Sequence, residues 1–339
     1  MNLPTFFGGV HPPEGKALTE NKPIEIFRPA DPREFIYPLS QHIGAPCSPV
    51  VAKGDAVLAG QKIADTDAFV SAPIFSAVSG TVKAVEARMT FTGSVETCIV
   101  IEVIRGFGYV LEIFPNAQGV IAIENNKPEA IKIMTEHNKN PKIKIMPHKV
   151  KYPQGAEKML IKTVTGQEVP LVPALPADVG CIVLNTRTAW QICKTIEEGL
   201  PVTERVVSVT GDAVVEPKNL QVPLGISVRK LIDACGDFKE EPLKVIAGGP
   251  MMGLAMRSLD VPAVKGTSGI LALTQKTAYI AEESACIRCG KCVEACPMHL
   301  EPTLLDHAVR RGDYSTFEAH GGMNCIECGS CAYSCPASR

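Results

Sequence analysis

The sequence reads Cys286-Ile287-Arg288-Cys289-Gly290-Lys291-Cys292-Val293-Glu294-Ala295-Cys296-Pro297 and, further on, Cys325-Ile326-Glu327-Cys328-Gly329-Ser330-Cys331-Ala332-Tyr333-Ser334-Cys335-Pro336. Both runs have the spacing C-x₂-C-x₂-C-x₃-C-P. In this spacing one loop holds three corners of a [4Fe–4S] cube, and the fourth cysteine ligates the neighbouring cube. The runs therefore predict two [4Fe–4S] clusters with exchanged fourth ligands. The first cysteine set is Cys286, Cys289, Cys292 and Cys335, and the second cysteine set is Cys296, Cys325, Cys328 and Cys331.

Zinc is the alternative metal for closely spaced cysteines. Zinc ribbons use two C-x₂-C pairs separated by a longer loop, which gives the third and fourth cysteines of each run no role. Small residues between the cysteines, such as Gly290, Gly329 and Ser330, allow backbone N–H groups to approach cluster sulfurs and tune the reduction potential. The intact repeat therefore favours iron–sulfur clusters over zinc.

Other cysteines and histidines offer weaker candidates. Five cysteines are scattered singly, and we expect them to be small buried side chains: Cys47, Cys98, Cys181, Cys193 and Cys235. Three histidines lie near the runs: His299, His307 and His320. Because the two sets already complete both clusters, we expect these histidines to be ordinary polar positions and not ligands or proton carriers.

Composition sets the class of protein. The 339 residues are 45% hydrophobic and 21% charged, which indicates a folded chain of two to four domains. The net charge of −2 comes from mixed charges without a basic stripe, so nucleic acid is not an expected partner. The N-terminus does not resemble a signal peptide, and no apolar run reaches the roughly 18 residues of a membrane span. We expect a cytosolic protein, or one peripheral on a membrane, whose cysteines serve metal chemistry and not disulfides.

The predicted fold class is α+β multidomain. Residues 1–103 carry short alternating stretches and resemble the barrel-sandwich β domain of biotinyl and lipoyl carriers, but their turn at 64–69 lacks the lysine that those carriers modify. Residues 104–203 predict an α/β domain with parallel strands. Its strands are expected at 119–123, 142–146 and 180–184, and its helices at 127–138 and 186–198.

The second half predicts two further domains. Residues 204–262 have the two-strand, helix, strand order of a β-grasp module of the SLBB-like, soluble-ligand-binding type, with Ser227 as helix N-cap. Its Gly-Gly-Pro-Met-Met-Gly turn at 248–253 fits either close approach of a ligand or simple turn geometry. Residues 263–339 predict a strand at 269–274 and a ferredoxin-like helical dicluster domain. Between its runs, a helix is expected to place Leu304, Leu305, Ala308 and Val309 on one face.

Motifs across the chain resemble one known family. They are Gly8-Gly9-Val10-His11-Pro12-Pro13, Tyr152-Pro153-Gln154-Gly155-Ala156-Glu157-Lys158, the glycine turn at 248–253 and the two cysteine runs. Together they resemble the C subunit of the Rnf electron-transport complex. The resemblance implies a peripheral protein on the cytoplasmic side of the cell membrane, in a translocase that exchanges electrons between NADH and ferredoxin. It also implies other Rnf subunits as partners. It further implies that residues 104–203 are an incomplete α/β domain of the complex I flavin-subunit type, in which family members have an FMN and NADH site.

The sequence departs from that family at the flavin site. Family members carry a glycine-rich loop and a Gly-Ala-Glu-Cys-Glu-Pro segment before the strand that matches 119–123. Here residues 99–104 run through Arg105-Gly106-Phe107-Gly108 directly into 109–115. A phosphate cradle needs a strand, several glycines and a helix N-terminus in sequence. We therefore assign no catalytic residue and no flavin or NADH residue.

Three functions follow from these features. The leading prediction is an electron-transfer subunit that relays electrons through two [4Fe–4S] clusters within the ion-translocating complex. The missing flavin segments favour a second prediction, a non-catalytic docking and wiring module. A third, the cluster-bearing part of a soluble hydrogenase-type reductase, fits the cysteines but not the motif at 8–13.

Overall fold

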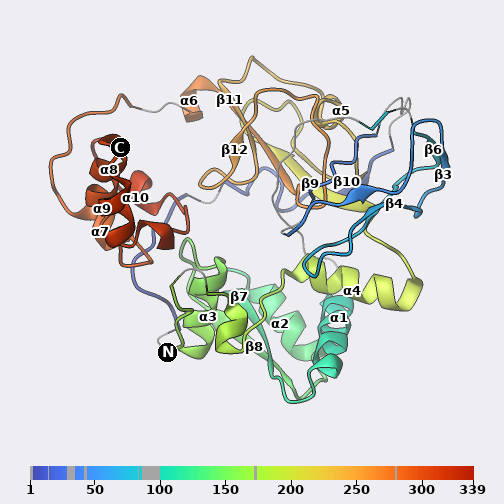
Figure 1. The fold of residues 1–339 in the computed structure, drawn as a ribbon, viewed down its shortest axis with the longest axis horizontal. Coiled ribbons are helices and arrows are strands. Elements are labelled where there is room, and N and C mark those ends of the chain that lie inside the picture. The colour runs from blue at the N-terminus through green and yellow to red at the C-terminus, as the bar shows by residue number, and fades with distance from the viewer. Residues whose placement is uncertain are drawn as a thin grey trace. The chain divides into compact units, whose positions relative to one another are not determined.

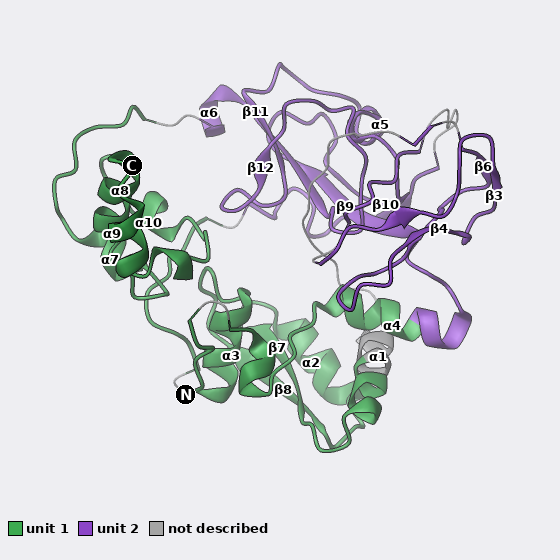
Figure 2. Ribbon diagram, viewed as in Figure 1, with its two compact units in different colours: residues 1–13, 97–193, 280–339 green, residues 14–96, 194–279 purple. Residues whose placement is uncertain are grey.

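The computed structural model describes residues 3–13, 15–28, 35–41, 44–82, 84–85, 100–171, 174–278 and 281–339. The chain forms two compact units (Figure 2). Unit 1 contains Met1–Pro13, Thr97–Cys193 and Ile280–Arg339, and unit 2 contains Glu14–Glu96 and Lys194–Tyr279. Each unit is described separately below.

Unit 2 is built on a six-stranded sheet with the order β1-β10-β9-β13-β11-β12 (Figure 1). The strands are β1 (Ile24–Ile26), β9 (Glu204–Thr210), β10 (Lys218–Pro223), β11 (Lys244–Ala247), β12 (Leu254–Ala255) and β13 (Gly269–Leu273). β9 pairs antiparallel with β10 and parallel with β13, and β11 pairs antiparallel with β13. The two-strand, helix, strand order predicted for a β-grasp module is present. β1 adds a parallel edge strand from the N-terminal part of the chain.

The core of this sheet lies under helix α5 (Val228–Ala234). Leu231 and Ile232 of the helix are fully buried, together with alternate residues of the strands, such as Val207 and Val209 of β9. Period-2 burial on a strand facing an apolar stripe on a helix is the pattern that fills one shared core. Each such aliphatic side chain contributes about 1.5–3 kcal/mol through burial. Ser227 takes the predicted N-cap position, without a side-chain cap hydrogen bond.

Glycine is required where β9 ends. Gly211 has φ +115°, and a Cβ there would lie 1.9 Å from the Ala272 carbonyl oxygen on β13. The turn at 248–253 also depends on close backbone approach. A Cβ on Gly253 would lie 2.4 Å from the Gly249 carbonyl oxygen, which accepts a hydrogen bond from the Gly253 N–H at 2.8 Å. These contacts favour the turn-geometry interpretation of that motif.

Short antiparallel strands make the barrel-sandwich part of unit 2. They form a three-stranded sheet β2-β4-β5 and a two-stranded sheet β3-β6: β2 (Ser48–Pro49), β3 (Ala56–Val57), β4 (Lys62–Asp65), β5 (Ile74–Phe75) and β6 (Gly80–Thr81). Cys47, Ala64 and Ile74 form a small buried core. Helix α6 (Gln275–Ala278) follows β13.

Unit 1 contains the α/β part. Strands β7 (Gly119–Glu124) and β8 (Ile143–His148) are parallel, and α2 (Pro128–His137) connects them, as predicted. The other elements are α1 (Val100–Ile113), α3 (Glu157–Thr165), the 3₁₀ helix η1 (Pro176–Val179) and α4 (Thr186–Glu198), which extends into unit 2. Leu111, Ile121, Met134, Ile143 and Ala189 form the core. Leu111 thus anchors α1 on the sheet.

One predicted strand is wrong. Residues 180–184 have no regular structure and follow η1, and Ile182 is 61% exposed. The described sheet here has two strands, β7 and β8, and 180–184 does not pair with either of them. An apolar run without a neighbouring strand cannot satisfy its backbone groups as a strand.

The C-terminal part of unit 1 consists of short helices joined by short loops. Its elements are α7 (Lys291–Ala295), α8 (Pro302–Arg310), α9 (Tyr314–Ala319), η2 (Gly322–Asn324) and α10 (Ser330–Tyr333). Leu305 and Ala308 of α8 are buried as predicted, whereas Val309 is 48% exposed. Among the helices that the structure describes, none combines the length and apolarity needed to cross a membrane.

The scattered cysteines are mostly core residues. Cys47, Cys193 and Cys235 are buried, as predicted, and Cys181 is half-buried. Burial raises the pKa of Cys235 to about 11, so this thiol stays protonated at neutral pH. Cys98 lies outside the described residues.

Candidate functional site

The two cysteine runs adopt the same backbone conformation. Arg288 and Glu327, each two residues after the first cysteine of its run, have φ of 55° and 54°. Gly290 and Gly329 have φ of 79° and 72°, and each caps a short helix, α7 or α10. The sequence repeat is therefore also a repeat of backbone conformation.

In both runs the left-handed residue directs its backbone N–H toward a cysteine sulfur. The N–H of Arg288 donates to Cys286 Sγ at 3.4 Å, and the N–H of Glu327 donates to Cys325 Sγ at the same distance. A left-handed conformation costs a non-glycine residue about 1–2 kcal/mol. Strained residues of this kind concentrate at functional sites, and here each turns an amide toward a sulfur.

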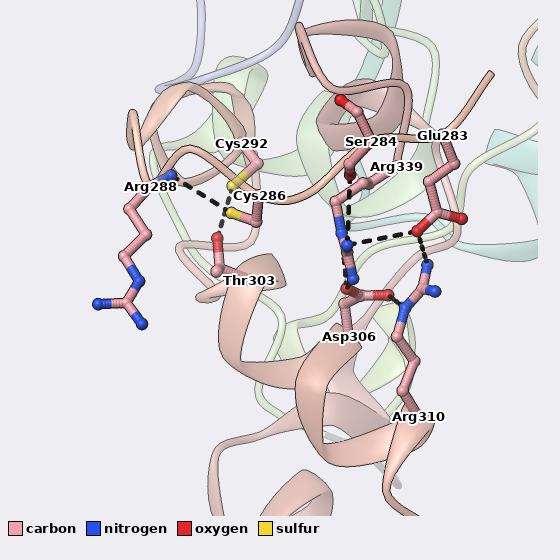
Figure 3. A network of polar contacts seen from close by, with 9 residues as sticks. All are labelled: Glu283, Ser284, Cys286, Arg288, Cys292, Thr303, Asp306, Arg310 and Arg339. Carbon is pink, nitrogen blue, oxygen red and sulfur yellow. Dashed lines mark hydrogen bonds and ion pairs between the residues drawn. The ribbon is translucent and has the colours of Figure 1, made fainter. Parts of the chain in front are cut away.

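Hydroxyl groups lie beside one sulfur of each set. Cys292 Sγ of the first set lies 3.1 Å from Thr303 Oγ1 on α8 (Figure 3). Cys328 Sγ of the second set lies 3.4 Å from Ser330 Oγ, which is fully buried. Hydrogen bonds to ligand sulfurs are one of the means by which proteins tune cluster potentials.

The thiols of the second set are mutual neighbours. Burial raises the pKa of Cys296, and the charges of Cys328 and Cys325 raise it further, against backbone hydrogen bonds that lower it. Burial likewise raises the pKa of Cys331, which interacts with Cys325, Cys328 and Cys296. Cys296 comes from the first run and the other three from the second, so thiols of the two runs lie near enough to interact electrostatically.

The first set is held from the C-terminal side. The Ser284 N–H, just before the first run, donates to the Ala337 carbonyl at 3.0 Å, just after the second run. Arg339 binds Asp306 on α8 at 2.6 Å and Glu283 at 3.3 Å (Figure 3). These contacts bring the chain after Cys335 beside the chain before Cys286.

An ion-pair network underlies that closure. Figure 3 shows Asp306 between Arg310 and Arg339, with Glu283 completing the cluster. Burial alone raises the pKa of Asp306, but hydrogen bonds from Arg310 and Arg339 outweigh it, and the net pKa lies below its ordinary value. Asp306 therefore stays ionised at neutral pH and keeps both arginines paired.

The histidines near the runs are polar surface positions. His299 stacks on Phe7 with ring centroids 4.7 Å apart. His307 and His320 are exposed at α8 and at the end of α9.

The donor set fits iron–sulfur clusters. Four separate irons of a cube each take one thiolate, so the ligands need not converge on one point. Among the described side chains, no three of the Cys, His, Asp and Glu groups meet closely enough for a single metal ion. The repeated loops, the amides aimed at sulfur and the hydroxyl contacts supply what a thiolate-bound cluster requires.

The described α/β residues do not fit a flavin phosphate. The loop from β7 to α2 is Asn125-Asn126-Lys127, without glycine, and α2 carries Glu129 in its first turn. α3, after β8, carries Glu157 in its first turn. A carboxylate at a helix N-terminus occupies the position where the positive end of the helix dipole attracts phosphate.

Sequence reasoning missed the side chains around the cysteines. Thr303, Ser330 and Arg339 have no fixed spacing to a cluster that a motif search uses. Only Ser330 lies inside a run, where its small size is apparent from the sequence but the contact of its hydroxyl is not.

Family comparisons match the chain in four parts. The matches are the RnfC barrel sandwich hybrid domain at residues 4–104, the Nuo51 FMN-binding domain at 99–194, the SLBB domain at 206–255 and the 4Fe-4S dicluster domain at 278–336. They confirm the predicted fold class and the order of its parts. The predicted boundaries at 103, 203 and 262 stay predictions.

Three relatives cover most of the chain. The C subunit of the proton-translocating ferredoxin:NAD(+) oxidoreductase complex of Clostridium ljungdahlii is 38% identical over 386 residues, 89% of this chain and 84% of the relative. The C subunit of the Na(+)-translocating complex of Acetobacterium woodii is 36% identical over 405 residues, 94% and 90% of the two chains. The C subunit of the ion-translocating oxidoreductase complex of Rhodobacter capsulatus is 33% identical over 392 residues, 90% and 75%.

The alignment lengths also show that the relatives are longer than this chain over the aligned part. The alignment with the first relative has 386 positions and covers 89% of this 339-residue chain. It is therefore several dozen positions longer than the part of the chain that it covers. The relative therefore carries several dozen residues without a counterpart here.

A solved structure gives a weaker likeness. An NAD+-reducing [NiFe]-hydrogenase has a TM-score of 0.49 and 11% identity over 69% of this chain and 49% of the other. This likeness carries no argument about fold or function. The family assignment rests on the sequence relatives: the chain belongs to the family of C subunits of Rnf-type, ion-translocating ferredoxin:NAD+ oxidoreductase complexes.

Proposed function

We propose that this chain is an electron-transfer subunit of an ion-translocating complex that exchanges electrons between ferredoxin and NADH. The observation that carries the proposal is the doubled cysteine loop, with matching left-handed residues at Arg288 and Glu327 and matching N–H···S contacts. When bound, two [4Fe–4S] clusters supply one-electron transfer steps.

The ligand assignment is part of the proposal. Cys286, Cys289, Cys292 and Cys335 hold one cluster, and Cys296, Cys325, Cys328 and Cys331 hold the other. The electrostatic interactions of Cys296 with Cys325, Cys328 and Cys331 support the second set. The contact between Ser284 and Ala337 supports the first, because it draws the two ends of the domain together.

The chain serves as a wiring module without flavin of its own. The support is the acidic first turn of α2 and of α3, where a phosphate site would need free amides and no carboxylate. NADH oxidation then belongs to another subunit. The family resemblance supports a peripheral position on the cytoplasmic side of the cell membrane, beside the other subunits of the complex. The relatives differ in their named ion, proton or Na(+), so the coupling ion is left open.

Cluster reduction by different donors tests this function. The full chain, reconstituted anaerobically with iron and sulfide, is mixed with dithionite, with reduced ferredoxin or with NADH, and bleaching of the visible cluster absorbance is followed. We expect dithionite and reduced ferredoxin to bleach the clusters and NADH alone to leave them oxidised. Rapid bleaching by NADH alone would contradict the wiring module and indicate a nicotinamide site in this chain.

A further inference from the structure

The segment at residues 6–10 binds the cysteine domain through its backbone. The Gly9 N–H donates to the Ala295 carbonyl at 2.8 Å. Gly8 has φ +72°, and a Cβ there would lie 2.7 Å from the Cys296 carbonyl oxygen. Only glycine permits this approach, because the Cβ of any other residue would clash with the backbone of Cys296. The segment therefore lies directly on the chain that presents Cys296.

The same segment is fastened to the α/β part. Val10 and Tyr152 form an antiparallel bridge, with N–H···O distances of 2.8 and 2.9 Å. Lys151 Nζ donates to the Phe6 carbonyl at 2.6 Å and lies 4.4 Å from the centre of the Phe6 ring. Lys151 is partly buried, and burial lowers its pKa. One short segment is thus fixed at both sides.

Tyr152 makes a second link to the cysteine domain. Its hydroxyl donates to the Cys328 carbonyl at 2.8 Å. That carbonyl shares a peptide group with the Gly329 N–H, inside the cysteine loop. A hydrogen bond to the carbonyl polarises the peptide and strengthens its N–H as a donor. Both links therefore reach residues of the second set, Cys296 and Cys328.

We propose that residues 6–10 and Tyr152 are positioning elements that fasten the cluster of the second cysteine set to the α/β part and raise its reduction potential. This inference rests on the proposed function, since it needs the ligand assignment given above. The first set is closed by Thr303 and by the Arg339–Asp306 pair instead. The second-set cluster is then the cluster that is tied to the α/β part.

Redox titration of the reconstituted full chain tests the proposal. The paramagnetic signals of the reduced clusters are first assigned with Cys296→Ser and Cys335→Ser. Tyr152→Phe removes one hydroxyl and keeps the ring. At fixed potential we expect it to lower the reduced-to-oxidised ratio of the second-set cluster several-fold, as for loss of one hydrogen bond, and to leave the first-set cluster unchanged. Gly8→Ala is expected to disturb the second-set signal more strongly.

Two control variants make the same chemical changes at positions that do not contact the second cysteine set. Tyr314→Phe alters a tyrosine of the same domain that is 65% exposed, and Gly312→Ala alters a left-handed glycine with open space around its Cβ position. Both should behave as wild type. An unchanged second-set cluster in Tyr152→Phe, or equal shifts in both clusters, would overturn the inference alone. Wild-type protein that binds fewer than about eight irons would overturn the proposed function and this inference with it.

Discussion

Loss of the Ser330 hydroxyl should lower the potential of the cluster bound by the second cysteine set. Ser330 Oγ lies 3.4 Å from Cys328 Sγ in a fully buried position. Once Cys328 is a thiolate ligand it has no proton to give, so the hydroxyl is the donor of this pair. The added electron of the reduced cluster makes the sulfur a better acceptor. The hydrogen bond therefore stabilises the reduced state more than the oxidised state.

The size of the shift follows from hydrogen-bond energies. One neutral hydrogen bond contributes about 0.5–1.5 kcal/mol. For a one-electron couple a tenfold change in the equilibrium, about 1.4 kcal/mol, equals about 59 mV. If the whole bond energy stabilises only the reduced state, Ser330→Ala lowers the potential by roughly 20–65 mV. The small change in side-chain volume leaves the packing of α10 intact.

The assay is an anaerobic redox titration followed by electron paramagnetic resonance, with Thr303→Val as the reciprocal variant. Thr303 Oγ1 lies 3.1 Å from Cys292 Sγ, so its loss should lower the potential of the first-set cluster only. Ser315→Ala, whose hydroxyl binds Asp313 on the surface, is the control. A shift of the first-set cluster in Ser330→Ala, or an unchanged or raised second-set potential, would refute the reasoning.

Three further predictions use single variants. Cys296→Ala should damage the cluster completed by the second run and Cys335→Ala the cluster begun by the first run, so two unchanged reduced signals in Cys335→Ala would contradict the exchanged-ligand assignment. Arg288 and Glu327 occupy equivalent left-handed positions with opposite charges. Arg288→Glu should therefore lower the potential of the first-set cluster and Glu327→Arg should raise that of the second-set cluster, each by roughly tens of millivolts and by less at high salt. Redox titrations at two ionic strengths test this, and shifts of the opposite sign would exclude it. Gly211→Ala should destabilise unit 2 by about 2–4 kcal/mol, because it adds a backbone clash to left-handed strain; denaturant unfolding measures this, and a variant as stable as wild type would show that β13 can move aside.

Periodicity was enough to predict the elements that bury one face. The helix at 186–198 matches α4, and the strands at 119–123 and 142–146 match β7 and β8 within two residues. β7 is a continuous apolar run, and α4 buries Ala189 and Cys193, which lie four residues apart on one helical face, so local pattern and tertiary burial agree. The strand predicted at 180–184 had the composition of a buried strand but no partner, which a local pattern cannot reveal.

Long-range pairing was not predictable from the sequence. The strand expected at 269–274 was assigned with the dicluster domain, yet β13 lies between β9 and β11 in the middle of the larger sheet. β1 joins the same sheet from the N-terminal part. Neither placement leaves a signal in the segment itself, because any exposed strand edge accepts a neighbour of suitable length.

The cluster ligands were predictable, and their surroundings were not. Thiolate spacing is set by the geometry of the cube, so the cysteines can be recognised from spacing alone. The groups that tune them depend on which backbone or side chain the fold brings near. Gly8 and Tyr152 belonged to motifs that carried the family resemblance, and their contacts with Cys296 and Cys328 emerge only in three dimensions.

The central claim is that this chain carries two [4Fe–4S] clusters and no flavin. It is tested most directly by measuring iron, acid-labile sulfide and flavin in one sample of the anaerobically reconstituted full chain. We predict about eight irons and about eight sulfides per chain, with flavin far below the protein concentration. About four irons, or zinc in place of iron, would contradict the two-cluster assignment. Stoichiometric flavin beside about eight irons would contradict the conclusion that α2 and α3 offer no phosphate site.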